Sequence, residues 1–302
     1  MQPKIVPLPT ACHVIDGLRA AGDFDVLAVE HREFPDGESY VRLEEDIEGA
    51  DIAVAASFHP PNAAIVDSFL AAETTRDLGA RSVGLVAPYL AYLRQDDRFR
   101  EGEGVTSRYV AKLLSEHFDW IATVDPHLHR LDSLDEIYAI PNLAIPSAPA
   151  IGDWLVDNVD RPLLIGPDDE SEQWVASVAE VADAPHHILE KERLGDRRVE
   201  IDMEALPEGD HHTPVVMDDI ISSGGTMIEA VKRLRERGLR SPVCIGIHGL
   251  FAENAFEELE RAGAERIVTT NTVRHHSNGI DVTELMAEAL RSYSHNVSRS
   301  SQ

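Results

Sequence analysis

The chain has 302 residues, with 54 acidic and 27 basic side chains and a formal net charge of −27. An acidic surface of this strength repels nucleic-acid phosphates and anionic membranes, so neither is an expected partner. The length is typical of two domains or one large α/β unit, and 43% hydrophobic residues are enough for a core.

The acidic residues are spread along the whole chain, and lysine occurs only four times. A dispersed acidic, lysine-poor surface is typical of halophilic proteins, because molar salt screens their self-repulsion. A merely acidic protein from ordinary salt is the alternative. The two cysteines, Cys12 and Cys244, do not make a disulfide framework. Neither a membrane span nor a secretion signal is evident, so we expect a cytoplasmic protein.

Short β-rich runs alternate with longer helical patterns. In the first half we predict strands at residues 52–57, 82–87 and 120–124 and helices at 62–78 and 107–117. In the second half we predict strands at 163–165, 185–189, 214–217, 243–248 and 266–270, and helices at 173–182, 226–237 and 252–262. This alternation indicates parallel α/β sheets with helices on both faces, which bind ligands at the carboxyl ends of their strands. The proline-rich segment 140–149 is the expected junction between the halves.

Two segments of the first half carry candidate ligand-binding residues. Residues 34–38 form an acidic turn near the end of the first βα unit, for which an ordinary Asp-Gly turn is the alternative. Residues 88–100 follow a buried strand and contain three arginines and two tyrosines. Arginine at this position suits a polyphosphate, and an aromatic or guanidinium plane suits a stacked base. A solvated loop whose arginines pair with nearby acids is the alternative.

Three further segments suggest metal binding or catalysis. His127 and His129 follow the strand at 120–124, and Asp168 follows the strand at 163–165; imidazole and carboxylate there could hold a divalent metal. Structural histidines and helix capping by Asp169 or Ser171 are the alternatives. Residues 190–198 contain a lysine in a chain that otherwise avoids it, which suits charge stabilisation during phosphoryl transfer, although an ordinary charged hairpin is equally compatible.

The most informative stretch is residues 215–226, in which an apolar strand leads through Asp218 and Asp219 into a small-residue loop and then a helix. The loop consists of Ser222, Ser223, Gly224, Gly225 and Thr226. Loop amides and a helix N-terminus bind phosphate, and paired carboxylates accept hydrogen bonds from vicinal hydroxyls. The pattern predicts a ligand with a phosphate at one end and hydroxyls or a metal at the other.

Taken in order, residues 34–38, 88–96 and 218–226 make the chain resemble the ribose-phosphate pyrophosphokinases, in particular their archaeal branch. The resemblance extends from Phe34 to about Asn271. It implies that the C1 hydroxyl of ribose 5-phosphate attacks the β-phosphorus of ATP, giving phosphoribosyl pyrophosphate and AMP. It also implies two tandem phosphoribosyltransferase-like domains, at residues 1–143 and 144–284, with the tail 285–302 packing on the first. A homo-oligomer, as a dimer, tetramer or hexamer, is implied as well.

The same resemblance implies roles for individual residues. Lys191 and Arg193 would be catalytic, and His127 and Asp168 would hold Mg²⁺. ATP would be bound by Asp36, Gly37, Glu38, Arg94, Gln95 and Asp96. The ribose hydroxyls would be bound by Asp218 and Asp219, and the 5-phosphate by the loop from Ser222 to Thr226. The family more often has an acid where this chain has Ser222, threonine where it has Ser223, and a glycine pair near Asp169 and Glu170.

Two other functions share some of these residues. A phosphoribosyltransferase would share the loop at 218–226 but would not explain residues 34–38 or 94–96. A non-catalytic regulatory homologue would keep the fold but would be expected to lose Lys191, Arg193, His127 and Asp168, all of which are present here.

Overall fold

The structure is a computed structural model that describes residues 2–21, 24–193, 199–202 and 211–300, with the backbone alone at 190–193, 199–202 and 294–300. The chain divides into two compact units. Unit 1 comprises Met1–Pro146, Thr272–Arg274 and Val282–Gln302, and unit 2 comprises Ser147–Asn271 and His275–Asp281.

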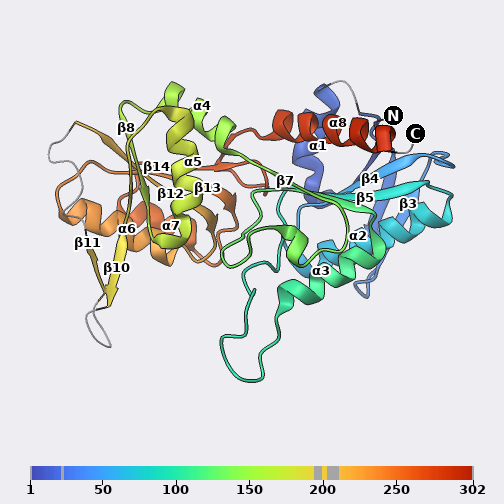
Figure 1. Cartoon of the computed structure of the whole chain (residues 1–302), viewed down its shortest axis with the longest axis horizontal. Helices are drawn as coiled ribbons and strands as arrows, with labels where there is room; N and C mark the ends of the chain where they lie inside the picture. Colours follow the sequence, from blue (N-terminus) through green and yellow to red (C-terminus); the bar gives the residue numbers. More distant parts are fainter. Residues whose placement is uncertain (1, 22–23, 194–198, 203–210, 301–302) are drawn as a thin grey trace. The chain divides into compact units, whose positions relative to one another are not determined.

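Unit 1 is built on a five-stranded parallel sheet with the strand order β1-β4-β5-β6-β7. The strands are β1 (Lys4–Pro7), β4 (Asp51–Ala55), β5 (Ser82–Ala87), β6 (Trp120–Val124) and β7 (Asn142–Ile145). One side is covered by α1 (Cys12–Ala20) and α8 (Thr283–Ser300), and the other by α2 (Pro61–Asp77) and α3 (Thr106–His117) (Figure 1). Helices on both faces explain why β4, β5 and β6 are apolar and buried almost throughout.

Unit 2 contains a six-stranded parallel sheet with the order β15-β14-β13-β12-β8-β9. The strands are β8 (Pro162–Gly166), β9 (His186–Ile188), β12 (Thr213–Ile221), β13 (Val243–Gly249), β14 (Arg266–Thr270) and β15 (Asn278–Ile280). The helices are α4 (Ala148–Asn158), α5 (Glu172–Ala182), α6 (Gly225–Glu236) and α7 (Ala255–Ala262). Right-handed crossovers place α5 on one face and α6 and α7 on the other, because the chain leaves β8 and β12 in opposite directions. Ligands bind sheets of this kind at such a reversal, beyond the carboxyl ends of the strands.

Two antiparallel hairpins accompany the sheets. Strands β2 (Val29–Glu33) and β3 (Ser39–Leu43) form a hairpin in unit 1 whose second strand contacts α2. Strands β10 (Glu190–Arg193) and β11 (Val199–Asp202) pair in unit 2. None of the described helices is long and apolar enough to cross a bilayer.

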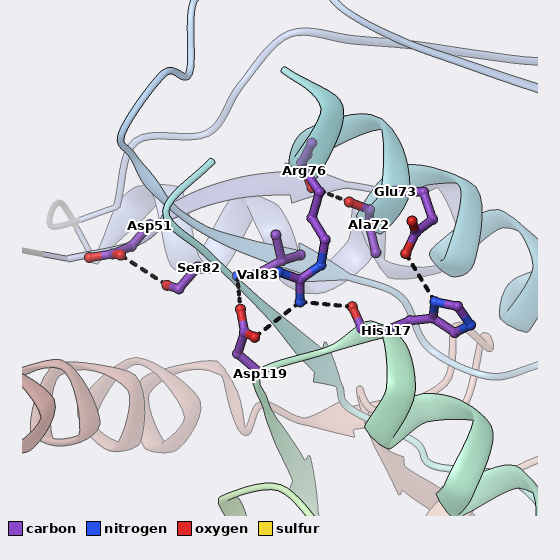
Figure 2. Close-up of polar contacts among 9 residues, drawn as sticks. Asp51, Ala72, Glu73, Arg76, Ser82, Val83, His117 and Asp119 are labelled. Atoms are coloured by element: carbon purple, nitrogen blue, oxygen red, sulfur yellow. Dashed lines mark hydrogen bonds and ion pairs between the residues drawn. The ribbon is translucent and has the colours of Figure 1, made fainter. Parts of the chain in front are cut away.

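A network of polar side chains fastens the amino edge of the unit 1 sheet (Figure 2). Arg76 of α2 lies 3.1 Å from the carboxylate of Asp119 and donates to the carbonyl of His117 at 3.1 Å. Asp119 also accepts a hydrogen bond from the backbone N–H of Val83 at 2.7 Å, and His117 Nδ1 lies 2.9 Å from Glu73 Oε1. These contacts join α2, α3, β5 and β6 at the edge opposite the strand carboxyl ends.

The predicted alternation is confirmed, since every predicted strand and helix is present with ends shifted by a few residues. Two details differ. Strand β12 continues to Ile221, so Asp218 and Asp219 lie inside the strand rather than after it. Residues 142–145 of the predicted junction form β7, the edge strand of the first sheet, and the boundary between units follows at Pro146.

Candidate active site

The predicted phosphate loop lies between the end of β12 and the start of α6. Gly224 has a φ of 70° and is the N-cap residue of α6, a left-handed conformation that glycine adopts at little steric cost. Its carbonyl accepts the hydrogen bond from Ile228 N–H at 2.8 Å. The preceding backbone N–H groups of the first helical turn have no carbonyl partner within an α-helix, which makes this end suited to an anion.

The segment after β13 supports the outer side of this loop. The backbone N–H groups of Leu250 and Phe251 both donate to the carbonyl of Ile221 at 3.0 Å, and that of Ala252 donates to the carbonyl of Ser222 at 3.0 Å. The loop is therefore held at its first residues by a neighbouring connection, while Ser223 and Gly225 remain exposed.

The acid pair lies beside the loop in a charged and partly buried environment. Asp219 is 3% exposed and Asp218 is half-buried. Burial raises the pKa of Asp218 well above its ordinary value, and the nearby charges of Asp219 and Asp168 raise it further. Asp168 follows β8, the strand that pairs with β12, so its charge acts on Asp218 from the neighbouring strand. We call Asp168, Asp218 and Asp219 the carboxylate cluster.

Asp168 is the N-cap residue of the short 3₁₀ helix η3 (Asp169–Ser171), and Ser171 is the N-cap residue of α5. The side chains of Asp168 and Ser171, the residues at the two N-cap positions, make no capping hydrogen bond to the described backbone. Instead, Ser171 Oγ donates to the Asp168 carbonyl at 2.6 Å, which fixes the turn. Of the two capping alternatives, capping by Ser171 is therefore wrong, and capping by Asp169 stays a prediction.

The acidic turn at residues 34–38 is the tip of the β2–β3 hairpin in unit 1. The prediction that it lies near the end of a βα unit is therefore wrong. The backbone N–H groups of Phe34 and Gly37 donate to Glu38 and Phe34 carbonyls at 2.7 and 2.8 Å. Gly37 has a φ of 93°, and Asp36 Oδ1 accepts from Glu38 N–H at 3.4 Å. Asp36, Gly37 and Glu38 are exposed.

The segment containing Arg94, Gln95 and Asp96 follows β5. Arg94 is exposed. Gln95 is fastened to the start of α3, because its carbonyl accepts from Ser107 N–H at 3.2 Å and its Oε1 accepts from Thr106 Oγ1 at 3.1 Å. The Asp96 side chain is only 3% exposed and lies 2.9 Å from Arg130 Nη1.

His127 and His129 follow β6, the strand next to β5. His127 is half-buried and His129 is exposed. The preceding Asp125 is held by β7, since its backbone N–H donates to the Ile145 carbonyl at 3.1 Å. Arg94–Asp96 and His127 therefore follow neighbouring strands of one sheet.

Lys191 and Arg193 are both in β10, where Lys191 pairs with Ile201 and Arg193 with Val199 of β11. Their side chains lie outside the described part of the structure. Their predicted catalytic role consequently stays a prediction.

The carboxylate oxygens of Asp168 and Asp218 are donor groups of the kind that Mg²⁺ prefers. No group of three or more His, Cys, Asp or Glu side chains within the described ranges is arranged to hold a metal ion. Mg²⁺ is usually bound by one or two carboxylates together with waters and substrate phosphates. A bound cation would offset the effects of burial and of the neighbouring negative charges, which together raise the pKa of Asp218.

Sequence patterns did not single out several residues that shape these sites. Arg130 pairs with Asp96, Phe251 supports the phosphate loop, and His31 pairs with Asp67 beneath the β2–β3 hairpin. Of these residues, only Arg130 was indicated by the sequence, because it lies three residues after the candidate ligand His127.

Comparison with known proteins gives two family matches. Residues 11–117 match the N-terminal domain of ribose phosphate pyrophosphokinase, and residues 133–285 match the phosphoribosyl transferase domain.

Relatives and one solved structure agree with these matches. The chain is 33% identical over 270 residues to a ribose-phosphate pyrophosphokinase of Sulfurisphaera tokodaii, covering 88% of this chain and 91% of that protein. It is 33% identical over 294 residues to that of Methanopyrus kandleri, covering 96% and 100%. A phosphoribosylpyrophosphate synthetase structure from Mycobacterium smegmatis has the same fold, with a TM-score of 0.84, 23% identity and coverage of 98% and 100%. The chain belongs to the ribose-phosphate pyrophosphokinase family.

Proposed function

We propose that this protein transfers the pyrophosphoryl group of ATP to the C1 hydroxyl of ribose 5-phosphate. The hydroxyl oxygen forms a bond to the β-phosphorus. The bond between that phosphorus and the oxygen that bridges it to the α-phosphorus breaks, and AMP leaves with this oxygen. The hydroxyl proton is lost in the reaction. The observation that carries the proposal is the phosphate loop between β12 and α6, which directly follows Asp218 and Asp219 and lies at the reversal of strand order in unit 2.

On the acceptor side, the loop from Ser222 to Thr226 binds the 5-phosphate through backbone N–H groups. Asp218 and Asp219 accept hydrogen bonds from the ribose hydroxyls, which orients the C1 hydroxyl for attack. The sheet supplies rigidity, because β12 pairs on both sides with β8 and β13.

On the donor side, Asp36, Gly37 and Glu38 bind the adenine end of ATP, and Arg94 and Gln95 contact the nucleotide. Support comes from their exposure at the hairpin tip and from the fastening of Gln95 to α3. A homo-oligomer belongs to the same proposal, and sedimentation velocity would test it.

His127 of unit 1 and Asp168 of unit 2 are each proposed as ligands of Mg²⁺, which would offset phosphate charge in the transition state. Lys191 and Arg193 stabilise the negative charge that develops on the transferring group. No side chain acts as a nucleophile, since the attacking atom belongs to the substrate.

The test is release of AMP from ATP and ribose 5-phosphate with Mg²⁺ and no nucleobase. Appearance of AMP together with phosphoribosyl pyrophosphate, followed by ³¹P NMR, supports the proposal. Product formation only when a nucleobase and phosphoribosyl pyrophosphate are supplied would identify a phosphoribosyltransferase instead. The matched control is Lys191→Ala, which should abolish turnover and retain ATP binding.

We also propose that the enzyme works in concentrated salt, on the basis of its net charge of −27. Turnover and thermal stability should then rise between ~0.1 M and molar KCl, over which the Debye length falls from about 10 to 3 Å. A maximum at low salt would contradict this assignment.

A further inference from the structure

The buried carboxylate of Asp96 has a single described ionic partner, Arg130. Arg130 Nη1 lies 2.9 Å from Asp96 Oδ1, and the side chains are 43% and 3% exposed. Exposed ion pairs contribute little to stability, but removal of one partner from a buried carboxylate leaves an uncompensated charge. The pair Arg19–Asp16 in the same unit, 60% and 84% exposed, is of the weak kind.

Arg130 also reaches the same connection at a second point. Its guanidinium carbon lies 5.1 Å from the centre of the Phe99 ring, within the range of a cation–π contact. Arg98, in contrast, donates from Nε to the Glu103 carbonyl at 2.8 Å. This contact lies entirely within the connection after β5. Arg130 instead joins the connection after β5 to the connection after β6.

One connection carries residues of the proposed donor side, and the other carries the proposed Mg²⁺ ligand His127. Arg94 and Gln95 immediately precede Asp96, and His127 lies three residues before Arg130. Gln95 is fastened separately to the start of α3, at Thr106 and Ser107. Loss of the ion pair would therefore release Asp96, while the neighbouring Gln95 stays attached to α3.

We infer that Arg130 and Asp96 form a positioning pair that holds Arg94 and Gln95 in register with the connection carrying His127. This inference rests on the proposed function for the identity of the nucleotide. The pair acts through these neighbours, so this inference gives Asp96 a positioning role in place of the direct contact with ATP that the resemblance implies.

A double-mutant cycle tests this role, with Arg130→Gln, Asp96→Asn and the two combined. Each single change should raise the KM for ATP by about 3- to 30-fold, a range typical of coupled neighbours, and leave the KM for ribose 5-phosphate within about twofold. The double variant should be no worse than the more impaired single variant. Arg130→Lys, which keeps the charge, should restore part of the loss.

Arg81→Gln is the matched control, because it breaks an arginine–aspartate pair with Asp51 at the opposite edge of the same sheet. It should lower thermal stability and leave both KM values unchanged. Additive effects of the two single changes would indicate independent contacts with ATP and overturn the inference. An equal rise in both KM values, or none, would overturn it as well.

Calorimetric ATP binding to the same variants separates this inference from the proposed function. If the wild-type protein binds ATP without forming AMP, the proposed function fails and the cycle is judged on binding alone. If Arg130→Gln does not fold, Arg130→Lys and Asp96→Asn carry the test, and unchanged ATP binding in both would overturn the inference.

Discussion

His31 Nε2 lies 3.1 Å from Asp67 Oδ2, which joins the β2–β3 hairpin to α2 through a pair whose side chains are only 17% and 12% exposed. The opposite face of the hairpin carries Arg32, whose guanidinium carbon lies 4.3 Å from the ring centres of both Phe34 and Tyr40. The hairpin thus has a buried polar anchor on one face and an exposed cation–aromatic cluster on the other.

Replacement of the anchor should destabilise the protein. His31→Leu leaves the Asp67 carboxylate buried without its partner, so we expect a loss of about 2–3 kcal/mol in the free energy of unfolding. Denaturant titration measures the loss. Arg42→Gln, which breaks an exposed pair with Glu30 in the same hairpin, should cost no more than about 0.5 kcal/mol. Equal losses in the free energy of unfolding for the two variants would show that the His31–Asp67 pair stabilises the protein no more than an exposed pair does.

The carboxylate cluster of unit 2 should lower the thermal stability of the protein, although it serves ligand binding. The folded-state pKa of Asp218 is raised, so the stability this group contributes is present at low pH and is lost as pH rises through that pKa. In metal-free buffer at neutral pH, Asp218→Asn should therefore raise Tm by about 2–4 °C. The same variant should raise the KM for ribose 5-phosphate about 10- to 100-fold, because charged hydrogen bonds to the hydroxyls are lost.

Asp153→Asn, which removes an exposed acid of α4, is the control for this experiment. This change should alter neither Tm nor the KM for ribose 5-phosphate. A fall in Tm for Asp218→Asn would mean that the acid cluster supports the fold rather than opposing it.

Asp51 should show the opposite pH dependence. Burial alone would raise its pKa, but hydrogen bonds from Arg81 and Ser82 and the charge of Arg81 outweigh that effect and lower it. A lowered folded-state pKa contributes stability above the unfolded value of about 3.9, and this contribution is lost as pH falls through the folded pKa. The stability difference between wild type and Asp51→Asn should be constant near neutrality and shrink in acid. A difference that persists at pH ~2 would contradict the ionic origin.

Gly84 lies where strand β5 meets the ring of Trp120. The two residues are partners in the β5–β6 register, and a Cβ on Gly84 would overlap the indole. Trp120 cannot easily retreat, because its ring centre lies 5.0 Å from that of Tyr293 in α8. Gly84→Ala should cost about 1–3 kcal/mol in unfolding free energy, measured by thermal or chemical denaturation. Gly238→Ala is a useful contrast, since its Cβ would meet open space and only its φ of 79° would add strain.

Periodicity predicted the regular elements because buried parallel strands such as β5 and β6 are nearly continuous apolar runs. It failed where an element is short, half-exposed or polar. Strand β2, which reads Val-Glu-His-Arg-Glu, has no apolar alternation, so its pairing with β3 was invisible and the tip at Asp36 was assigned to a different unit type. The end of β12 was missed for a related reason, since Asp218 and Asp219 interrupt the apolar run although the backbone continues to Ile221.

The candidate site was predictable in its residue types but not in its supports. The small-residue loop with Gly224 and the acids before it follow from backbone geometry and hydrogen-bond chemistry. The proximity of Asp168 to Asp218 depends on β8 and β12 being neighbours, which is a tertiary fact. The same holds for Arg130 and Asp96, which are 34 positions apart in the chain and meet because β5 and β6 pair.

Helix α8 is the last described element of the chain, yet it belongs to the unit that begins the chain and packs against α1. The approach is close, since a Cβ on Gly17 of α1 would lie 2.6 Å from Thr283 Cγ2. During translation, α1 therefore cannot pack against α8 until unit 2 has been synthesised. The first unit thus cannot be completed as it leaves the ribosome, because its packing depends on residues made after unit 2.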